Sequence, residues 1–286
     1  MVATMNKYKA KKIAKKIILS FIAILIASMI IFPVVWILPA AFKTKKELFQ
    51  IPNTIFPKKF TINNFVKVFQ IEVNGSTFIK SILSTMLVAL LSTFSSLFVN
   101  MIAGYALARI NFKMRKWVWI FLLFPMFIPG ITIMLTSIRV VNILHMNDTI
   151  FALFVPGMAN SYQMFFFRQF YLGIPRDLEE AALIDGASRR QVFFRIFTPM
   201  STTPMIIIGV GTFMGAWNSF IWPTLTVSEN KNLVQVMQII RMLHSQYSGD
   251  YGIVIAATLM SLVVPLTIFA IFNKKIVEGI AFTGQK

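Results

Sequence analysis

The sequence predicts an all-α, polytopic membrane protein with six transmembrane helices and a helix–Gly–helix loop on the cytoplasmic side. Three observations support this prediction. Hydrophobic residues make up 57% of the 286 residues, and charged residues make up only 13%, whereas soluble domains carry about 25% charged residues. The mean hydropathy is +0.72. Long apolar runs alternate with short basic segments. This composition excludes a disordered protein, a coiled coil and an ordinary soluble enzyme.

Six apolar runs are long enough to cross a bilayer, whose hydrocarbon core of about 30 Å needs about 20 helical residues. The predicted spans cover residues 17–42, 78–108, 117–138, 149–167, 204–226 and 251–273. The first run is longer than the apolar region of a signal peptide, so we expect it to be retained. No Gly/Ser linker or internal repeat divides the chain, and we expect residues 1–286 to form one membrane domain.

The basic residues predict the orientation of the chain. If both termini are cytoplasmic, the inner segments carry roughly twice as many Lys and Arg residues as the outer loops, as the positive-inside rule requires. The first outer loop opposes this bias with six lysines, namely Lys43, Lys45, Lys46, Lys58, Lys59 and Lys67. We expect the basic N-terminal segment to contact anionic membrane lipids and not nucleic acid.

Several kinds of chemistry are excluded or disfavoured by the residues themselves. The chain has no cysteine and two histidines, so we expect neither thiolate chemistry nor a bound metal. No charged residue lies in the middle of a span, which argues against an ion-driven carrier. No phosphate-binding loop is present. The sequence therefore predicts a protein that is not an enzyme, binds no cofactor and has no energy source of its own.

The predicted cytoplasmic loop at about 173–203 is rich in acidic residues, because four of the ten in the chain lie between Asp177 and Asp185. Pro175 suits the first position of a helix, and the acids that follow suit its first turn, where the helix dipole favours negative charge. Gly186 is expected to end this helix.

A second helix is expected directly after the first. Ser188 and Gln191 have the spacing of a capping box, and Pro199 is expected to close this helix. Its apolar face consists of Val192, Phe193, Ile196 and Phe197. The loop is therefore predicted to be a hairpin of two short helices.

The order Glu180–Ala181–Ala182, Gly186, Ile196 and Pro199 resembles the EAA loop of permease subunits of binding-protein-dependent ABC importers. The extended form EAALIDGA resembles the carbohydrate branch of these permeases, which serves maltose, raffinose and multiple-sugar systems. The segment AWNSFIWP at 216–223 and the tail FNKKIVEGIAFTGQK are also similar to that branch, and the length fits its smaller permease. One departure is Thr198, where the family commonly has Leu.

The resemblance implies that the loop is a coupling helix seated in a cleft of a cytoplasmic ATPase. Glu180 would be the charged anchor, and Ala181 and Ala182 would form the close-contact face. Asp185 would supply polar contacts or a cap, and Gly186 would make the turn. ATPase closure would then alternate the access of the pathway.

The partners implied by the resemblance are a second permease in a heterodimer, two ATP-binding cassette ATPase subunits and an extracytoplasmic sugar-binding protein. The ATPase would use ATP and Mg, and this chain would hold no cofactor. The protein would be a multi-pass component of a bacterial cell membrane.

Four residues are candidates for the substrate pathway: Asn160, Gln163, Trp217 and Asn218. Amide groups hydrogen-bond sugar hydroxyls, and aromatic rings stack on the apolar faces of sugars. The alternative is that they pack helices together.

Other functions stay open. The chain could be an ABC permease for a polyamine, phosphate or peptide, an ATP-independent facilitator, or an enzyme acting on lipid-linked sugar. Missing mid-span charges disfavour the facilitator, and missing paired acids disfavour the enzyme. The residues do not indicate which sugar is carried.

Overall fold

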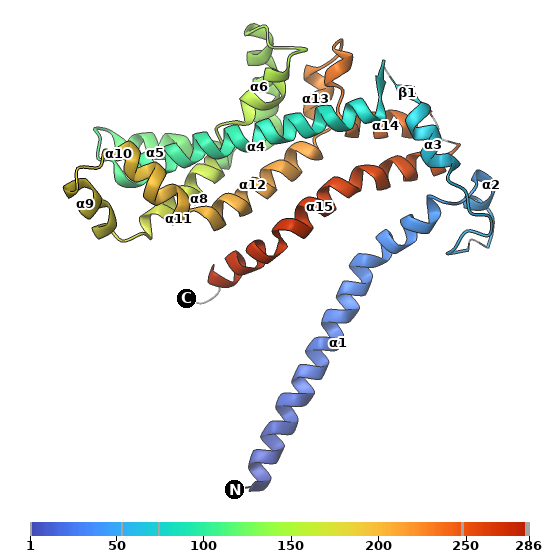
Figure 1. Ribbon diagram of the computed structural model, residues 1–286, viewed down its shortest axis with the longest axis horizontal. Coiled ribbons are helices and arrows are strands. Elements are labelled where there is room, and N and C mark those ends of the chain that lie inside the picture. Colours follow the sequence, from blue (N-terminus) through green and yellow to red (C-terminus); the bar gives the residue numbers. More distant parts are fainter. Residues whose placement is uncertain (1, 53, 74, 247–248, 284–286) are drawn as a thin grey trace. The chain divides into compact units, whose positions relative to one another are not determined.

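The computed structural model describes residues 2–52, 54–73, 75–246 and 249–283. Helices make up nearly all of its regular structure (Figure 1). Among the described residues, two strands occur, β1 (Glu72–Val73) and β2 (Ser76–Thr77), which pair antiparallel with Glu72 opposite Thr77. The all-α class predicted from composition is confirmed.

The chain divides into two units. Unit 1 comprises Met1–Val68 and Gln246–Met260, and unit 2 comprises Phe69–Ser245 and Ser261–Lys286. The expectation of one membrane domain over the whole chain stays a prediction.

Unit 1 contains helix α1 (Val2–Ala40), the short α2 (Lys45–Leu48), most of α3 (Asn63–Gln70) and the first part of α15 (Tyr251–Thr283). After α1 the chain is held by Asn64, whose side-chain amide donates to the carbonyls of Ala41 at 2.7 Å and Lys43 at 2.9 Å.

Two lysines of this unit are engaged inside it. Lys43 is buried, and its ammonium donates to the carbonyl of Thr54. The ammonium of Lys67 lies 3.3 Å from the carboxylate of Asp250. Two of the six lysines that opposed the charge bias therefore have local structural roles.

Unit 2 is built around α4 (Phe78–Arg109), which packs against α8 (Ser161–Leu172) and α12 (Thr202–Trp217) (Figure 1). The remaining elements are α5 (Arg115–Leu123), η1 (Phe124–Phe127), α6 (Gly130–Ile143), α7 (Ile150–Phe154), η2 (Val155–Gly157), α9 (Asp177–Ile184), α10 (Arg189–Val192), η3 (Phe193–Phe197), α11 (Thr198–Met200), α13 (Ile221–Thr226), η4 (Lys231–Leu233) and α14 (Val236–Gln246).

Three single helices are long and apolar enough to cross a membrane, within Lys12–Ala40, Phe78–Arg109 and Tyr251–Glu278. Three bent pairs raise the number to as many as six, by length and composition, in the described part of the chain. The pairs are Arg115–Phe127 with Gly130–Ile143, Ile150–Gly157 with Ser161–Leu172, and Arg189–Met200 with Thr202–Trp217, bent by 107°, 46° and 76°.

Each of the predicted spans 117–138, 149–167 and 204–226 contains a break in the helix. Pro129 precedes α6 at the first break, and Pro156 lies in the short helix η2 at the second. In the third span, α12 ends at Asn218 and a new helix, α13, follows. Pro223 lies in the first turn of α13, where a missing N–H costs no hydrogen bond.

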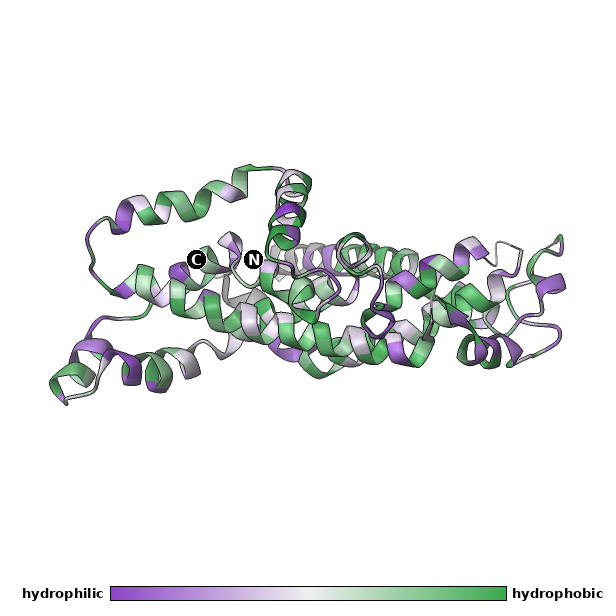
Figure 2. Cartoon of the chain, turned by 90° about the horizontal axis from the view of Figure 1, so that it is seen from above, coloured by the Kyte–Doolittle hydropathy of each residue, from purple (hydrophilic) through white to green (hydrophobic). Residues whose placement is uncertain are grey.

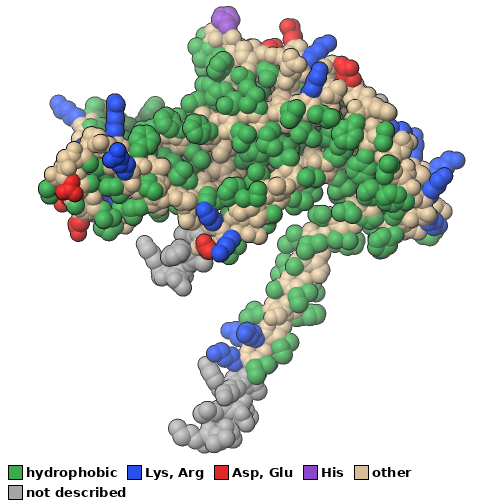
Figure 3. Space-filling view, in the orientation of Figure 1, with side chains coloured by type: hydrophobic (Ala, Val, Ile, Leu, Met, Phe, Trp, Pro, Cys, Tyr) green, Lys and Arg blue, Asp and Glu red, His purple; other side chains and the backbone are tan. Residues whose placement is uncertain are grey.

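Large apolar side chains are exposed along the helices. Phe94 is 75% exposed on α4, and Phe121 is 76% exposed on α5. Figure 2 shows hydrophobic residues along the long helices, and Figure 3 shows them over most of the visible surface, with charged side chains gathered in a few places, one of which is the α9–α10 region. Such a surface suits bilayer hydrocarbon or a membrane partner and not water.

Asp148 fastens the start of α7 to the segment after α13. Its carboxylate accepts backbone N–H bonds from Ser228 and Glu229 at 2.7 Å and from Asn230 at 3.1 Å. The bond from Glu229 is the largest cause that holds the pKa of Asp148 below its usual value, and the bonds from Asn230 and Ser228 act in the same direction.

We expect Asp148→Asn to loosen this connection at neutral pH, so that limited proteolysis cuts residues 226–235 faster. Because folding lowers the pKa, the carboxylate's contribution is complete above the unfolded value of 3.8 and is lost as the pH falls below it. Acidifying the wild type should therefore reproduce the effect of the variant. Glu229→Gln, at an exposed neighbouring carboxylate, is the control and should cut at the wild-type rate.

Candidate functional site

The first helix of the loop between α8 and α12 forms as its sequence predicts. Helix α9 carries Asp177, Glu179 and Glu180 in its first turn. Gly186 follows its end with a φ of +82°, a conformation that favours glycine. The expectation that Pro175 opens the helix is wrong, because Arg176 is the N-cap residue and α9 begins at Asp177.

The second helix begins with the predicted capping box. The backbone N–H of Ser188 donates to Oε1 of Gln191 at 2.7 Å, and the backbone N–H of Gln191 donates to Oγ of Ser188 at 3.4 Å. These reciprocal bonds satisfy donors that have no partner within the helix. The two helices and Gly186 therefore make the predicted hairpin.

The expectation that Pro199 closes the second helix is wrong. The helix continues from α10 through the π-helical turn η3 into α11, whose C-cap residue is Ser201. In this turn the N–H of Thr198 donates to the carbonyl of Phe193, five residues back, and the Thr198 hydroxyl donates to the same carbonyl at 3.0 Å. The wider turn accommodates the proline, which has no N–H to donate.

The apolar face of the second helix is buried, as predicted. Phe197 is completely buried, and its ring lies 4.9 Å from that of Tyr105 on α4 and 5.5 Å from that of Tyr171 on α8. Val192 and Phe193 belong to the same cluster. The hairpin is thereby packed onto the ends of α4 and α8.

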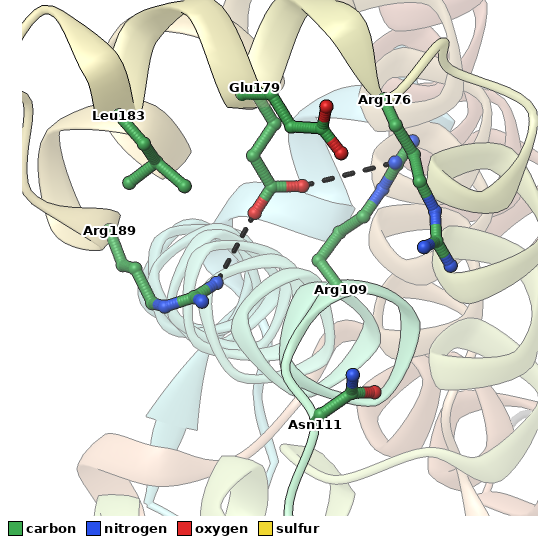
Figure 4. A pocket seen from close by; sticks show the side chains of 7 residues that line it. Arg109, Asn111, Arg176, Glu179, Leu183 and Arg189 are labelled. Atoms are coloured by element: carbon green, nitrogen blue, oxygen red, sulfur yellow. Dashed lines mark hydrogen bonds and ion pairs between the residues drawn. The ribbon is translucent and has the colours of Figure 1, made fainter.

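A buried charge cluster adds polar contacts to this packing. The side chain of Glu179 is only 9% exposed, and Figure 4 shows its carboxylate between the guanidinium groups of Arg109 and Arg189. Its Oε1 lies 3.4 Å from Nη1 of Arg189 and accepts a 3.3 Å bond from the Tyr105 hydroxyl. Its Oε2 lies 3.8 Å from Nη1 of Arg109.

Arg109 joins several elements of the structure. It is the last residue of α4, its side chain is 4% exposed, and its Nη2 donates to the carbonyls of Tyr171 and Ile174. Its guanidinium also lies over the ring of Phe197, 5.1 Å from the centroid. This side chain of α4 thus contacts α8, the α8–α9 connection, α9 and η3.

Most of the residues predicted to contact the ATPase are exposed on the hairpin. Glu180, Ala181 and Asp185 are exposed, and Asp185 is the C-cap residue of α9. Ala182 is half-buried against the apolar cluster. Ala182, Asp185 and Gly186 line a cleft of about 360 Å³ between the two helices of the hairpin.

Glu179, Tyr105 and Arg109 were missed as functional candidates by the sequence analysis. The signal for Arg109 was its place at the end of an apolar run, which indicated only membrane topology. For Glu179 the acid cluster was noticed, but its residues could not be assigned to different faces of the helix. In the described part of the chain, no three His, Asp or Glu side chains are grouped to hold a metal ion.

Two of the predicted pathway residues, Asn160 and Gln163, meet in one polar network. The side-chain amide of Gln163 donates to the hydroxyl of Thr212 on α12 at 3.0 Å, and its oxygen accepts from Ser96 at 2.7 Å and Asn100 at 3.2 Å on α4. Asn160 caps α8, because its side-chain oxygen accepts the N–H of Gln163 at 3.1 Å. The network joins three helices.

The other two predicted pathway residues lie apart from this network. Trp217 is completely buried and stacks on Phe213 at a centroid distance of 5.9 Å. Asn218 is exposed, and its amide donates to the carbonyl of Met214 in its own helix at 2.9 Å. Sugar contact by all four residues stays a prediction.

We expect Gln163→Leu to lower the free energy of unfolding by about 1–3 kcal/mol, because the buried Ser96 and Asn100 on α4 and the half-buried Thr212 on α12 lose hydrogen bonds. Asn218→Leu should stay within about 0.5 kcal/mol, because its amide bonds only its own helix on an exposed surface. Thermal unfolding of the purified variants measures both. Equal losses would contradict a helix-joining role for Gln163.

Comparison with known proteins agrees with this arrangement. The arabinooligosaccharides transport system permease protein AraQ of Bacillus subtilis (strain 168) is 28% identical over 95% of this chain and 96% of its own length. The sn-glycerol-3-phosphate transport system permease protein UgpE of Escherichia coli O1:K1 / APEC is 28% identical over 88% of this chain and 91% of its own length.

A crystal structure of a bacterial ABC transporter involved in the import of the acidic polysaccharide alginate has the same fold, with a TM-score of 0.79 and 16% identity. That similarity covers 90% of this chain and 95% of the other. Residues 96–277, which are more than half of the chain and include the hairpin, match the family described as binding-protein-dependent transport system inner membrane component. The chain belongs to this family and is a membrane transport component, not an enzyme.

Proposed function

We propose that this chain and a second permease form the translocation pathway of an ATP-driven sugar importer. The observation that carries the proposal is the α9–α11 hairpin, which presents exposed acidic and small residues on one side and is fixed to α4 and α8 on the other. The names of its relatives support sugar-like cargo, because they include permeases for arabinooligosaccharides and for sulfoquinovosyl glycerol.

Each residue on the exposed side has a proposed role. Glu180 is the charged anchor on the ATPase, and Ala181 and Ala182 allow close approach of its surface. Asp185 ends α9, and the positive φ of Gly186 sets the angle of the hairpin. Closure of the ATPase dimer moves the hairpin, and the helices carry this motion to the pathway.

The proposed assembly contains two ATP-binding cassette ATPase subunits and an extracytoplasmic sugar-binding protein in addition to the two permeases. A solved alginate importer with 20% identity to this chain was crystallised in complex with an alginate pentasaccharide-bound periplasmic protein. The ATPase uses ATP and Mg, and this chain binds neither. Both termini lie in the cytoplasm of a bacterium, as the basic segments favour.

A second candidate cargo is a phosphorylated polyol. The relative UgpE is a permease for sn-glycerol-3-phosphate and is as identical to this chain, at 28%, as the arabinooligosaccharide permease. An ATP-independent facilitator is the less favoured alternative, since it gives the hairpin no role.

The test is uptake into proteoliposomes that contain the complex purified with its natural partners. We expect ATP-dependent uptake of a radiolabelled oligosaccharide, and we expect Glu180→Lys and Gly186→Pro to abolish uptake and the hydrolysis stimulated by the binding protein. Glu229→Lys, at an exposed carboxylate outside the hairpin, is the matched control and should transport normally. Uptake of sn-glycerol-3-phosphate alone would support the second cargo, and uptake without ATPase or ATP would overturn the proposal.

A further inference from the structure

Two adjacent carboxylates on α9 differ in exposure. The side chain of Glu179 is 9% exposed and points toward the end of α4, whereas Glu180 is exposed, although both line the same cavity. Both residues occupy the first turn of the helix, where either charge would stabilise it. A helix start therefore explains neither the burial of Glu179 nor the difference between the two residues.

The contacts of Glu179 are two hydrogen bonds, from Tyr105 and Arg189, and an ion pair with Arg109, and they come from two other elements. Tyr105 and Arg109 belong to the last turns of α4, and Arg189 belongs to α10. The arginine from α4 is more deeply buried than Glu179, at 4% exposure, and donates to two backbone carbonyls, one at the end of α8 and one in the α8–α9 connection. The carboxylate is thus clamped between a helix that crosses the membrane by length and composition and the second helix of the hairpin.

Such a clamp transmits motion differently from apolar packing. Apolar contacts are non-directional, whereas an ion pair or a hydrogen bond depends on the positions of particular atoms. A carboxylate at 9% exposure that moves away from its guanidinium partners loses its ion pairs while it stays largely shielded from solvent. A displacement of α9 is therefore expected to pull the end of α4 with it.

We propose that Glu179 is the positioning residue that transmits movement of the hairpin to α4, with Tyr105 and Arg109 as its partners. This inference rests on the proposed function, in which an ATPase moves the hairpin. It assigns separate tasks to neighbouring residues, since Glu180 attaches the ATPase and Glu179 passes the displacement to the membrane helix that packs against α8 and α12.

The test compares Glu179→Gln with Glu180→Gln, the same substitution at adjacent positions of one helix. The full complex is purified through its binding-protein-dependent ATPase, and three quantities are measured: the amount of permease that remains attached, ATP hydrolysis, and solute imported per ATP. We expect Glu179→Gln to retain the ATPase and to lower the solute imported per ATP about tenfold, the effect of losing one hydrogen bond to a charged group. Glu180→Gln should instead lower the amount of attached permease.

Two further variants separate transmission from folding. Tyr105→Phe removes one hydroxyl from the clamp and keeps the ring stacking, so we expect a smaller loss of import per ATP, about threefold. Glu179→Asp keeps the charge and should recover part of the import that Glu179→Gln loses. The melting temperature of each variant complex is measured alongside.

A folded Glu179→Gln complex that imports solute at the wild-type ratio would overturn the inference. Loss of ATPase attachment in Glu179→Gln would also overturn it, by placing Glu179 on the docking surface, but would leave the proposed function intact. If Tyr105→Phe imports as much solute per ATP as the wild type while Glu179→Gln fails to fold, the contacts of Glu179 are structural and the inference is wrong. Transport by wild type without any ATPase would instead overturn the proposed function.

Discussion

Replacing Gly104 with valine is expected to lower the free energy of unfolding by at least about 3 kcal/mol, at the upper end of what overpacking a core costs. A Cβ at this position of α4 would lie 2.8 Å from Cβ of Phe167 and 3.0 Å from the backbone nitrogen of Arg168 on α8. Neither atom can turn away without moving α8 itself. The extra methyl groups therefore force α4 and α8 apart.

The measurement is thermal or denaturant unfolding of the purified protein, with the yield of folded protein in membranes as a second readout. Gly211→Ala and Gly215→Ala on α12 are matched controls, because a Cβ at either position meets nothing within 4 Å. The better helix propensity of alanine should leave these controls neutral or stabilise them by up to about 1 kcal/mol. A Gly104→Val protein as stable as the controls would show that α4 and α8 do not approach this closely.

The hairpin was predictable from sequence because its boundaries depend on local chemistry. Gly186 ends α9 through its own φ, and Ser188 and Gln191 form their reciprocal bonds within four residues of each other. The path beyond Phe193 was not predictable in the same way. Burial of Phe193 and Phe197 against α4 favours a π-helical turn, and this turn lets the chain continue through Pro199.

The separate roles proposed for Glu179 and Glu180 could not be predicted from the sequence, for a related reason. Adjacent carboxylates have the same propensities and the same interaction with the helix dipole, so only the rotation of α9 about its axis separates Glu179 from Glu180. Packing of Ala182 and Leu183 against the apolar cluster sets that rotation, and tertiary contacts of this kind are absent from the sequence pattern.

For the substrate-pathway candidates, the sequence alone does not determine the role. An amide or an indole in an apolar segment is suited equally to sugar binding and to joining helices. In this structure Gln163 joins α4 to α12, and Trp217 is completely buried. Residue type alone could not decide between these uses, because the decision depends on which neighbours the helices bring within hydrogen-bonding distance.

Replacing Arg109 with methionine is the second large effect, with an expected loss of about 3–5 kcal/mol in the free energy of unfolding. Methionine fills similar space but leaves the buried carboxylate of Glu179 without its charged partner from α4. It also leaves the carbonyls of Tyr171 and Ile174 without the donor that now joins them. Arg190→Met, at an exposed site on α10, should stay within about 0.5 kcal/mol.

A double variant distinguishes the loss of the ion pair from the loss of packing. Removing both charges of a buried pair is often nearly neutral, whereas removing one partner leaves an uncompensated charge. Adding Glu179→Met to Arg109→Met should therefore recover part of the lost stability, even though it removes another polar side chain. If the stability losses of the two single variants add up to that of the double variant, Glu179 and Arg109 act independently. The stability provided by Arg109 would then arise from its bonds to the carbonyls of Tyr171 and Ile174 and from its contact with the Phe197 ring.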